Sequence, residues 1–248
     1  MLLDKGAAID ATYRNANRAT ALHCAAFRGH IEVMEVLLDR GAAIDATIDD
    51  GETALQLAAS KGHIEVMKLL LDRGAAIDAT DDSEWTALRW AATEGHIEVM
   101  TLLLDRGAAI DATAGDSWTA LTWAANRGHL EAVKLLLDRG AAIDVTSDKG
   151  PTGLHRAAEW GHIEVVKVLL DRGAAIDAVT SNGWTALHCA ARGGHIEVVK
   201  LMLDNGATTD RKTADGETAL DIARQRGRER VVELLTSAAY NRIFNPVL

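Results

Sequence analysis

The stretch Thr185-Ala186-Leu187-His188-Cys189-Ala190-Ala191-Arg192-Gly193-Gly194-His195 decides the fold, because variants of it recur along the chain at a constant spacing. Its opening triplet Thr-Ala-Leu begins at five other threonines, and Thr152 begins a Thr-Gly-Leu variant. Each repeat is 33 residues long, a period typical of solenoids in which every repeat buries its apolar face on its neighbours. The seven repeats are anchored at Thr20, Thr53, Thr86, Thr119, Thr152, Thr185 and Thr218.

Each repeat predicts two short helices and a hairpin. Threonine favours the N-cap position, so the first helix begins there and ends near the glycine of the Gly-His pair. In repeat one the second helix runs from about Ile31 to Leu38 and stops at Gly41. Leu22, Ala25 and Ala26 form the core face of the first helix. Helices this short are not stable alone, so we expect neighbouring repeats to stabilise one another.

The run Gly183 to Ala191, with Gly194 to Leu201 after it, resembles an ankyrin repeat. That family usually carries proline where this chain has Ala21, and asparagine where it has Asp45; neither change threatens the fold. The resemblance covers nearly the whole chain. It implies an all-α ankyrin-repeat solenoid, an elongated and curved stack of helix-turn-helix units with projecting β-hairpin fingers. It also implies a binding role through the concave side.

The two ends of the chain depart from the repeat. We expect the array to span residues 1–236, with residues 1–10 matching only the tail of a repeat, and a C-terminal tail over 237–248. The first hairpin, around Tyr13 to Arg18, is two residues longer than the others. Repeat seven turns polar, with Arg228 in place of the usual histidine, as suits a terminal cap that meets water. The aromatic residues of the tail either dock on this last repeat or stay loose.

Composition narrows the class of protein. The formal net charge is −10, which disfavours nucleic acid and anionic membranes, because both are bound through lysine and arginine. Neither a signal peptide nor a transmembrane run is evident in the sequence. Cys24 and Cys189 occupy the same position five repeats apart, too far for a disulfide, and we expect both to be small apolar surface residues. We therefore expect a cytoplasmic monomer that acts without a cofactor or metal.

Comparing the seven repeats shows which positions vary. The changes concentrate at the residue before the threonine and at four, seven and eight residues after it. On a helix the last three share one face, opposite the Leu and Ala-Ala core face. The family resemblance would make this face concave, with the preceding residue at the hairpin tip beside it.

All six tryptophans fall at these variable positions, and tryptophan and arginine are the residues most enriched at binding hot spots. Repeats three to five therefore form the predicted centre of a partner-binding site. An alternative is that a helix tryptophan packs on the tryptophan of the neighbouring repeat and stiffens the array. The predicted partner-binding residues are Trp85, Arg89, Trp90, Glu94, Trp118, Trp123, Arg127, Arg156, Trp160 and Trp184.

Histidines and aspartates also recur in register, which favours structural roles. A catalytic histidine needs one special environment, whereas these occupy two repeated positions, and in ankyrin repeats such histidines hydrogen-bond the backbone and the nearby threonine. Aspartates such as Asp39 lie beside an arginine in each repeat and are expected to be solvated. Aspartates of the hairpins, such as Asp81, suit tight turns and could give the hairpins an acidic edge. The sequence shows no phosphate-binding loop, nucleophile elbow or zinc spacing.

The pattern as a whole predicts a protein–protein interaction module and not an enzyme. An engineered or reconstructed scaffold without a physiological partner stays open, because the variable positions resemble those diversified in designed ankyrin binders. Framework positions that drift without pattern, such as Met34 against Val166, argue against a design. A targeting segment of a larger effector or enzyme also stays open.

Overall fold

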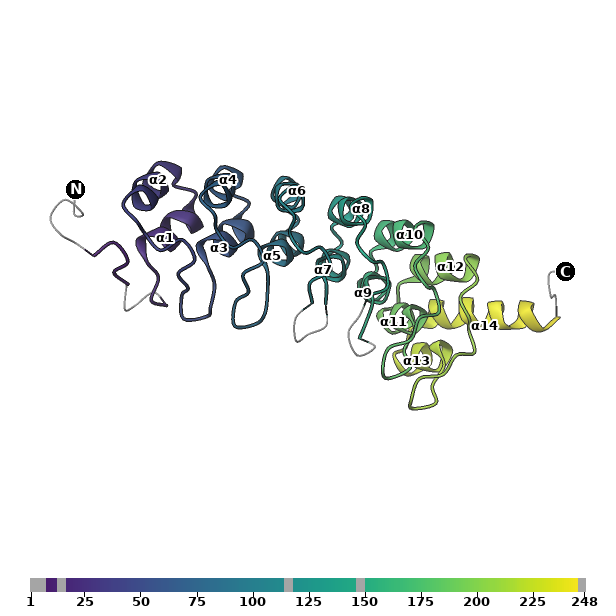
Figure 1. Ribbon diagram of the computed structural model, residues 1–248. Coiled ribbons are helices and arrows are strands. Elements are labelled where there is room, and N and C mark those ends of the chain that lie inside the picture. Colours follow the sequence, from purple (N-terminus) through teal and green to yellow (C-terminus); the bar gives the residue numbers. More distant parts are fainter. Residues whose placement is uncertain (1–7, 13–16, 114–117, 146–149, 245–248) are drawn as a thin grey trace. The chain divides into compact units, whose positions relative to one another are not determined.

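The structure, a computed structural model, describes residues 8–12, 17–113, 118–145 and 150–244, with side chains as far as Tyr240. The chain divides into two compact blocks, the N-terminal block (Met1–Asp116) and the C-terminal block (Ser117–Leu248). The described residues contain fourteen helices. Within each block, Figure 1 shows the odd-numbered helices in one row and the even-numbered helices in a second row beside it.

Every repeat contributes one helix to each row. The first helices are α1 (Ala21–Arg28), α3 (Ala54–Lys61) and α5 (Ala87–Glu94) in the N-terminal block, then α7 (Ala120–Arg127), α9 (Gly153–Trp160), α11 (Ala186–Gly193) and α13 (Ala219–Gln225) in the C-terminal block. The second helices are α2 (Ile31–Asp39), α4 (Ile64–Asp72), α6 (Ile97–Asp105), α8 (Leu130–Asp138), α10 (Ile163–Asp171), α12 (Ile196–Asp204) and α14 (Glu229–Phe244). The helix-turn-helix solenoid predicted from the 33-residue period is thereby confirmed.

The predicted capping residues lie at both ends of the first helices, with threonine at the start and glycine after the end. The Thr53 hydroxyl accepts a hydrogen bond from the Gln56 backbone N–H at 3.4 Å, and Thr218 accepts one from Asp221 at 3.2 Å. These bonds satisfy a backbone donor that has no partner within the helix. Gly29 follows α1 with a φ of 74°, a left-handed conformation that suits glycine. The equivalent glycines up to Gly194 repeat this termination.

The core lies between the two helix rows and between successive repeats. Leu22, Ala25 and Ala26 are buried on α1, as predicted, and the same positions are buried in repeats two to six. Because alanine is small, successive first helices approach closely: α1 packs on α3 and α3 on α5, and in the other block α7, α9, α11 and α13 pack in sequence. Burial of these faces against neighbours stabilises helices that are too short to persist alone.

Two polar links join consecutive repeats. The ring Nε2 of His63 lies 3.1 Å from the backbone carbonyl oxygen of Phe27, 36 residues earlier. A carboxylate oxygen of Asp45 accepts a hydrogen bond from the backbone N–H of Ala76 at 3.0 Å, 31 residues later. The second link recurs at Asp78, Asp144 and Asp177. Aspartate therefore performs the acceptor role at the position where the family usually has asparagine.

The hairpins between repeats are short turns and not strands of a sheet. Within the described residues an isolated bridge pairs Thr47 with Thr53, and the Ile48 N–H donates to the Glu52 carbonyl at 3.0 Å. Neighbouring hairpins are joined by single backbone hydrogen bonds, such as that from Asp82 N–H to the Asp50 carbonyl at 3.1 Å. The expected fingers are present as these turns. The long first hairpin lies largely outside the described residues.

The last helix is longer than its counterparts in the other repeats. Helix α14 packs on α12 and α13 and continues to Phe244, so residues 237–244 extend a helix of repeat seven. Tyr240 on this extension is 59% exposed. The boundary at residue 236 stays a prediction, and the partial repeat at residues 1–10 is described only from residue 8. None of the described helices has the length and apolar character needed to cross a membrane.

Candidate partner-binding face

The positions that vary among the repeats bring their side chains together on the first helices and the adjoining hairpins. We name these positions, the residue before each threonine and those four, seven and eight after it, the variable face. Phe27 is 46% exposed and Trp160 is 59% exposed, whereas Thr93 and Ile222, also on the variable face, are buried. The variable face therefore mixes side chains that are open to a partner with side chains that pack inward.

In repeat three the hairpin tryptophan stacks on the helix tryptophan. The ring centroids of Trp85 and Trp90 are 4.6 Å apart, with the ring planes tilted by 46°. The Trp90 indole Nε1 donates to a carboxylate oxygen of Asp81 at 3.1 Å, and the same carboxylate accepts the backbone N–H of Trp85 at 2.9 Å. Tilted aromatic pairs at this distance attract each other. Asp81 is buried, so it orders this pair and contributes little to any acidic edge.

Repeat four contains the same tryptophan pair. Trp118 and Trp123 have ring centroids 4.5 Å apart and planes tilted by 49°. Both pairs form inside one repeat, because the residue before the threonine lies beside the residue four positions after it.

A chain of aromatic and charged side chains then crosses repeats four, five and six. The guanidinium of Arg156 lies 4.3 Å from the Trp118 ring centroid and 2.5 Å from a carboxylate oxygen of Glu159. Glu159 also pairs with Arg192, whose guanidinium lies 4.9 Å from the Trp184 ring centroid. We name Trp118, Arg156, Glu159, Arg192 and Trp184 the ladder. Each charge in the ladder has an opposite charge or an aromatic ring beside it, which holds these long side chains in place.

Trp160 lies beside the ladder and is more open to solvent. Its indole Nε1 donates to the amide oxygen of Asn126 at 2.9 Å, so the ring is oriented although 59% of the residue is exposed. Glu94 and Arg127 are also exposed, at the ends of α5 and α7. An oriented and exposed tryptophan presents apolar area to a partner at a low cost in side-chain entropy.

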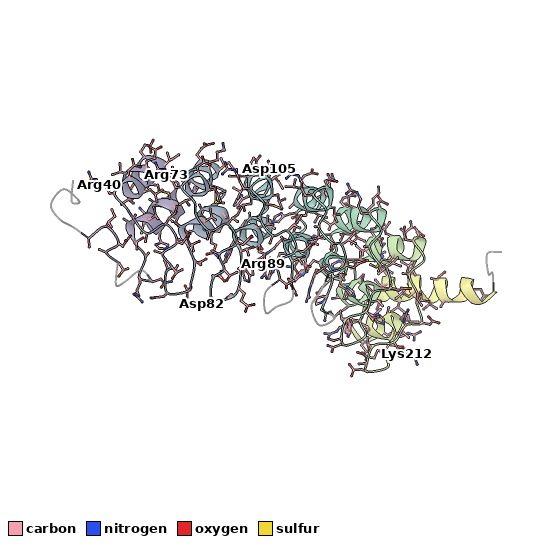
Figure 2. The ribbon with its side chains drawn as sticks, in the orientation of Figure 1. Arg40, Arg73, Asp82, Arg89, Asp105 and Lys212 are labelled. Carbon is pink, nitrogen blue, oxygen red and sulfur yellow. The ribbon has the colours of Figure 1, made fainter. Side chains whose placement is uncertain are left out.

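Arg89, which is labelled in Figure 2, is placed differently from the expectation. It is 1% exposed, its Nη1 donates to the Glu84 carbonyl at 3.4 Å, and its guanidinium lies 4.9 Å from the Trp85 ring centroid. Arg89 thus supports the tryptophan pair from beneath the surface and is not accessible to a partner. The reason is its position three residues after the threonine, where the polar side chains of other repeats, such as Gln56 and His155, are also buried and bond the backbone.

Family models of ankyrin repeats match residues 2–58, 43–114, 121–170, 154–203 and 194–236. The chain belongs to the ankyrin repeat family. A crystal structure of the human ASB11 ankyrin repeat domain is similar, with a TM-score of 0.78 and 29% sequence identity over 88% of this chain and 98% of that chain. No curated protein sequence matches this chain significantly. Ankyrin repeats are generally protein–protein interaction modules and typically not enzymes.

The histidines that lie three residues after the threonine of their repeats have the predicted structural role. In repeat five the Nδ1 of His155 accepts from the Thr152 backbone N–H at 3.2 Å, and its Nε2 lies 3.0 Å from the Trp184 carbonyl oxygen. These contacts suit the neutral ring with its proton on Nε2. Burial lowers the pKa of His155, and it also lowers the pKa values of His23 and His188, which make equivalent bonds.

The two cysteines differ although they share one position of the repeat. Cys24 is exposed, as expected, whereas Cys189 is 6% exposed and is therefore not a surface residue. Burial, with the nearby Glu159 carboxylate, raises the pKa of the Cys189 thiol to about 12. Among the residues that the structure describes, no group of three or more histidine, cysteine or acidic side chains is placed to hold a metal.

The prediction from the sequence missed four residues of this site, which are Asp81, Asn126, Glu159 and Arg192. The last three lie seven residues after the threonine of their repeats, and their side chains bond across neighbouring repeats: Glu159 to Arg192 and Asn126 to Trp160. The available signal was the register, because Glu159 and Arg192 occupy the same position in consecutive ankyrin repeats. Residues at equal positions in adjacent repeats lie side by side, so opposite charges there predict an ion pair.

Proposed function

We propose that this chain is a protein–protein interaction module whose variable face binds a partner protein. The anchors are the tryptophan pair of repeat three in the N-terminal block, and the Trp118–Trp123 pair with Trp160 and Trp184 in the C-terminal block. The observation that carries the proposal is that every tryptophan lies on the variable face and none in the repeated core. Tryptophan dominates binding energy at protein interfaces because it buries a large area with few rotatable bonds.

The fixed geometry of these side chains supports the same proposal. Trp90 is held by Asp81, Trp160 by Asn126, and Arg156 by Glu159. A face whose side chains are ordered before binding loses less conformational entropy when a partner arrives. Packing for stability alone would not require the Trp160 residue to be 59% exposed.

The net charge of −10 favours a protein partner over nucleic acid. We further propose a monomer in the cytoplasm, since both cysteines are free thiols, as is usual in a reducing compartment. Sedimentation of the purified chain measures its association state.

The test compares partner recovery by the full chain with recovery by two variants. The first replaces Trp85, Trp90, Trp118 and Trp123 with alanine, and the second is the single change Trp160→Ala. Because Trp160 is exposed, its removal leaves the melting temperature nearly unchanged and isolates binding from stability. We expect neither variant to recover the partners that the wild-type chain recovers from a cell lysate. The affinity of each variant for these partners should be lower by at least about tenfold.

A matched control changes four residues away from the variable face. Glu65, Lys68, Glu131 and Lys134 form two exposed ion pairs on α4 and α8, and such pairs contribute little to stability. Their replacement with alanine should leave partner recovery intact. Recovery of the same partners by the tryptophan variants would show that the tryptophans do not anchor the partner.

A further inference from the structure

Repeats one and two enclose a groove that the tryptophans do not reach. It has a volume of about 460 Å³ and is open to solvent, within the size range of ligand-binding pockets. Its apolar lining comes from Cys24 and Phe27 on α1, Leu57 on α3 and Ile48 on the hairpin between them. Phe27 is 46% exposed, so the groove presents apolar area to solvent in the free protein.

One wall of the groove carries a carboxylate without a cation. Glu52 lines the groove and is half-buried, and its side chain makes no hydrogen bond or ion pair with the residues that the structure describes. Burial raises the pKa of Glu52, and the neighbouring carboxylates of Asp81 and Asp50 raise it further, against a smaller opposing effect of Lys61. A carboxylate that is partly removed from water and surrounded by like charges is stabilised by an added cation.

The two ends of the groove carry opposite charges. Glu52 and Asp50 belong to the hairpin side, whereas Arg28 and Lys61 are the last residues of α1 and α3. An eight-residue helix is about 12 Å long, so the acidic and basic ends of the groove are separated by roughly that length. The Lys61 ammonium already lies 4.7 Å from the Phe27 ring centroid, which makes the basic end a poor place for a second cation.

We propose that this groove docks a short segment of a partner protein in which an arginine or lysine is adjacent to a leucine-sized apolar residue. The cation meets Glu52 at the hairpin end, and the apolar side chain covers Phe27 and Leu57. This proposal rests on the proposed function, because the groove is lined by residues of the variable face, but it involves other repeats than the tryptophan anchors and a different chemistry.

A second cavity, of about 240 Å³, lies between repeats five and six but offers less to a ligand. Its charged lining residues Arg156, Arg192 and Glu159 already pair with one another. In the first groove, by contrast, the Glu52 carboxylate pairs with no cation among the described residues. Charge complementarity with a basic partner therefore favours the first groove as the docking site.

The chain contains its own reporter for this groove. Cys24 is exposed and lines the groove, whereas Cys189 is buried with its pKa raised to about 12. Because the thiolate is the reactive form, iodoacetamide near neutral pH should label Cys24 well before Cys189 in the folded chain. A segment bound in the groove covers Cys24 and slows its alkylation, independently of any event at the tryptophans.

The experiment uses a library of random heptapeptides, selected on the full chain, followed by synthesis of the enriched peptides. We expect enriched peptides to pair arginine or lysine with an adjacent apolar residue and to slow Cys24 alkylation at least about tenfold at saturation, since a covered thiol reacts slowly. Glu52→Gln should weaken their binding about tenfold to a hundredfold, the usual range for losing a bond to a charged group. Phe27→Ala should also weaken it, and because both residues are partly exposed the fold is retained.

The matched control is Glu217→Gln, which changes the same position in repeat seven and should leave peptide binding unchanged. The proposal is overturned if no peptide is enriched, if the enriched peptides lack a basic residue, or if they bind Glu52→Gln as well as wild type. It is also overturned if they bind without protecting Cys24. Trp160→Ala separates the two proposals. A Trp160→Ala variant that loses its lysate partners while peptides still protect Cys24 would show an effect on the tryptophan anchors and none on the groove.

Discussion

The Nε of Arg228 donates a hydrogen bond to the backbone carbonyl oxygen of Arg192 at 3.1 Å. His195 makes the equivalent contact one repeat earlier, with its Nε2 2.9 Å from the Glu159 carbonyl oxygen, and both links span 36 residues. The arginine that marks repeat seven as different therefore preserves the link between repeats while it extends a charge into solvent. A terminal repeat gains solubility in this way without losing its contact with the preceding repeat.

Replacing Arg228 with alanine should lower the free energy of unfolding by about 1 kcal/mol, the usual contribution of one hydrogen bond. Arg228→His should retain most of this stability, because the histidines at the same position, His63, His96, His162 and His195, make the same contact with the preceding repeat. Urea denaturation followed by circular dichroism measures both changes. Arg230→Ala, at an exposed neighbouring position, should stay within about 0.5 kcal/mol of wild type. Equal effects of the alanine changes at 228 and 230 would contradict a role for the bond.

Acidification should destabilise the chain through its three buried histidines. Burial lowers the pKa values of His23, His155 and His188, so below the unfolded-state value of about 6.5 the unfolded chain binds more protons than the folded chain. The contribution of these histidines to the free energy of unfolding is therefore complete above about pH 6.5. It is lost as the pH falls toward their lowered pKa values, by up to about 1.4 kcal/mol per pH unit for each histidine. Urea denaturation between pH 5.5 and 7.5 tests this slope.

Glutamine provides the control for the histidines. Gln56 occupies the same position in repeat two and makes the same contacts, with Oε1 accepting from Thr53 N–H at 2.7 Å and Nε2 donating to Ala79 and Trp85 carbonyls. Changing all three histidines to glutamine should flatten the pH dependence, and the difference from wild type isolates the histidine contribution from that of carboxylates. An unchanged slope in this variant would assign the effect to other groups.

Glu159→Ala should cost about 2 kcal/mol of stability, because it leaves Arg156 and Arg192 close together without a counter-charge. The Glu159 side chain is 18% exposed, which places this network between surface and buried ion pairs in strength. The comparison is Asp39→Ala, which removes an exposed pair with Arg73 and should cost less than about 0.5 kcal/mol. Thermal or urea denaturation measures both, and similar small costs would show that the ladder adds little stability.

Glu84→Gly should stabilise the chain by about 0.5–1 kcal/mol. Glu84 has a φ of 60°, whereas the same position is Gly51, Gly183 or Gly216 in other repeats, with φ values of 73° to 80°. Residues with a Cβ pay a steric cost in this left-handed region that glycine avoids. The reciprocal change Gly216→Ala should destabilise by about 1 kcal/mol, and a Cβ there meets no atom within 4 Å, so the cost reports backbone conformation alone. A loss of stability in Glu84→Gly, measured by urea denaturation, would contradict this account.

The repeat pattern predicted the fold closely because its determinants are local. The threonine caps, the left-handed glycines and the Leu and Ala-Ala core face lie within one repeat and recur in repeats one to six. The bonds of His155 to Thr152 and to the backbone followed from the same regularity. By contrast, Arg89 was predicted at the surface and is buried beneath Trp85, and Cys189 was predicted at the surface and is buried.

By itself the sequence determined the period, the helix boundaries, the core and the positions free to vary, because identical residues at identical spacing form identical local bonds. Tertiary structure alone decided which of the variable side chains remain open to a partner. Arg156 and Glu159 pair with each other and with Arg192 of the next repeat, while Trp160 stays exposed and Glu52 is left without a cation. The physical reason is that groups of an adjacent repeat, such as Arg192 beside Glu159, decide whether a variable side chain is paired or left open, and no single repeat specifies their identity.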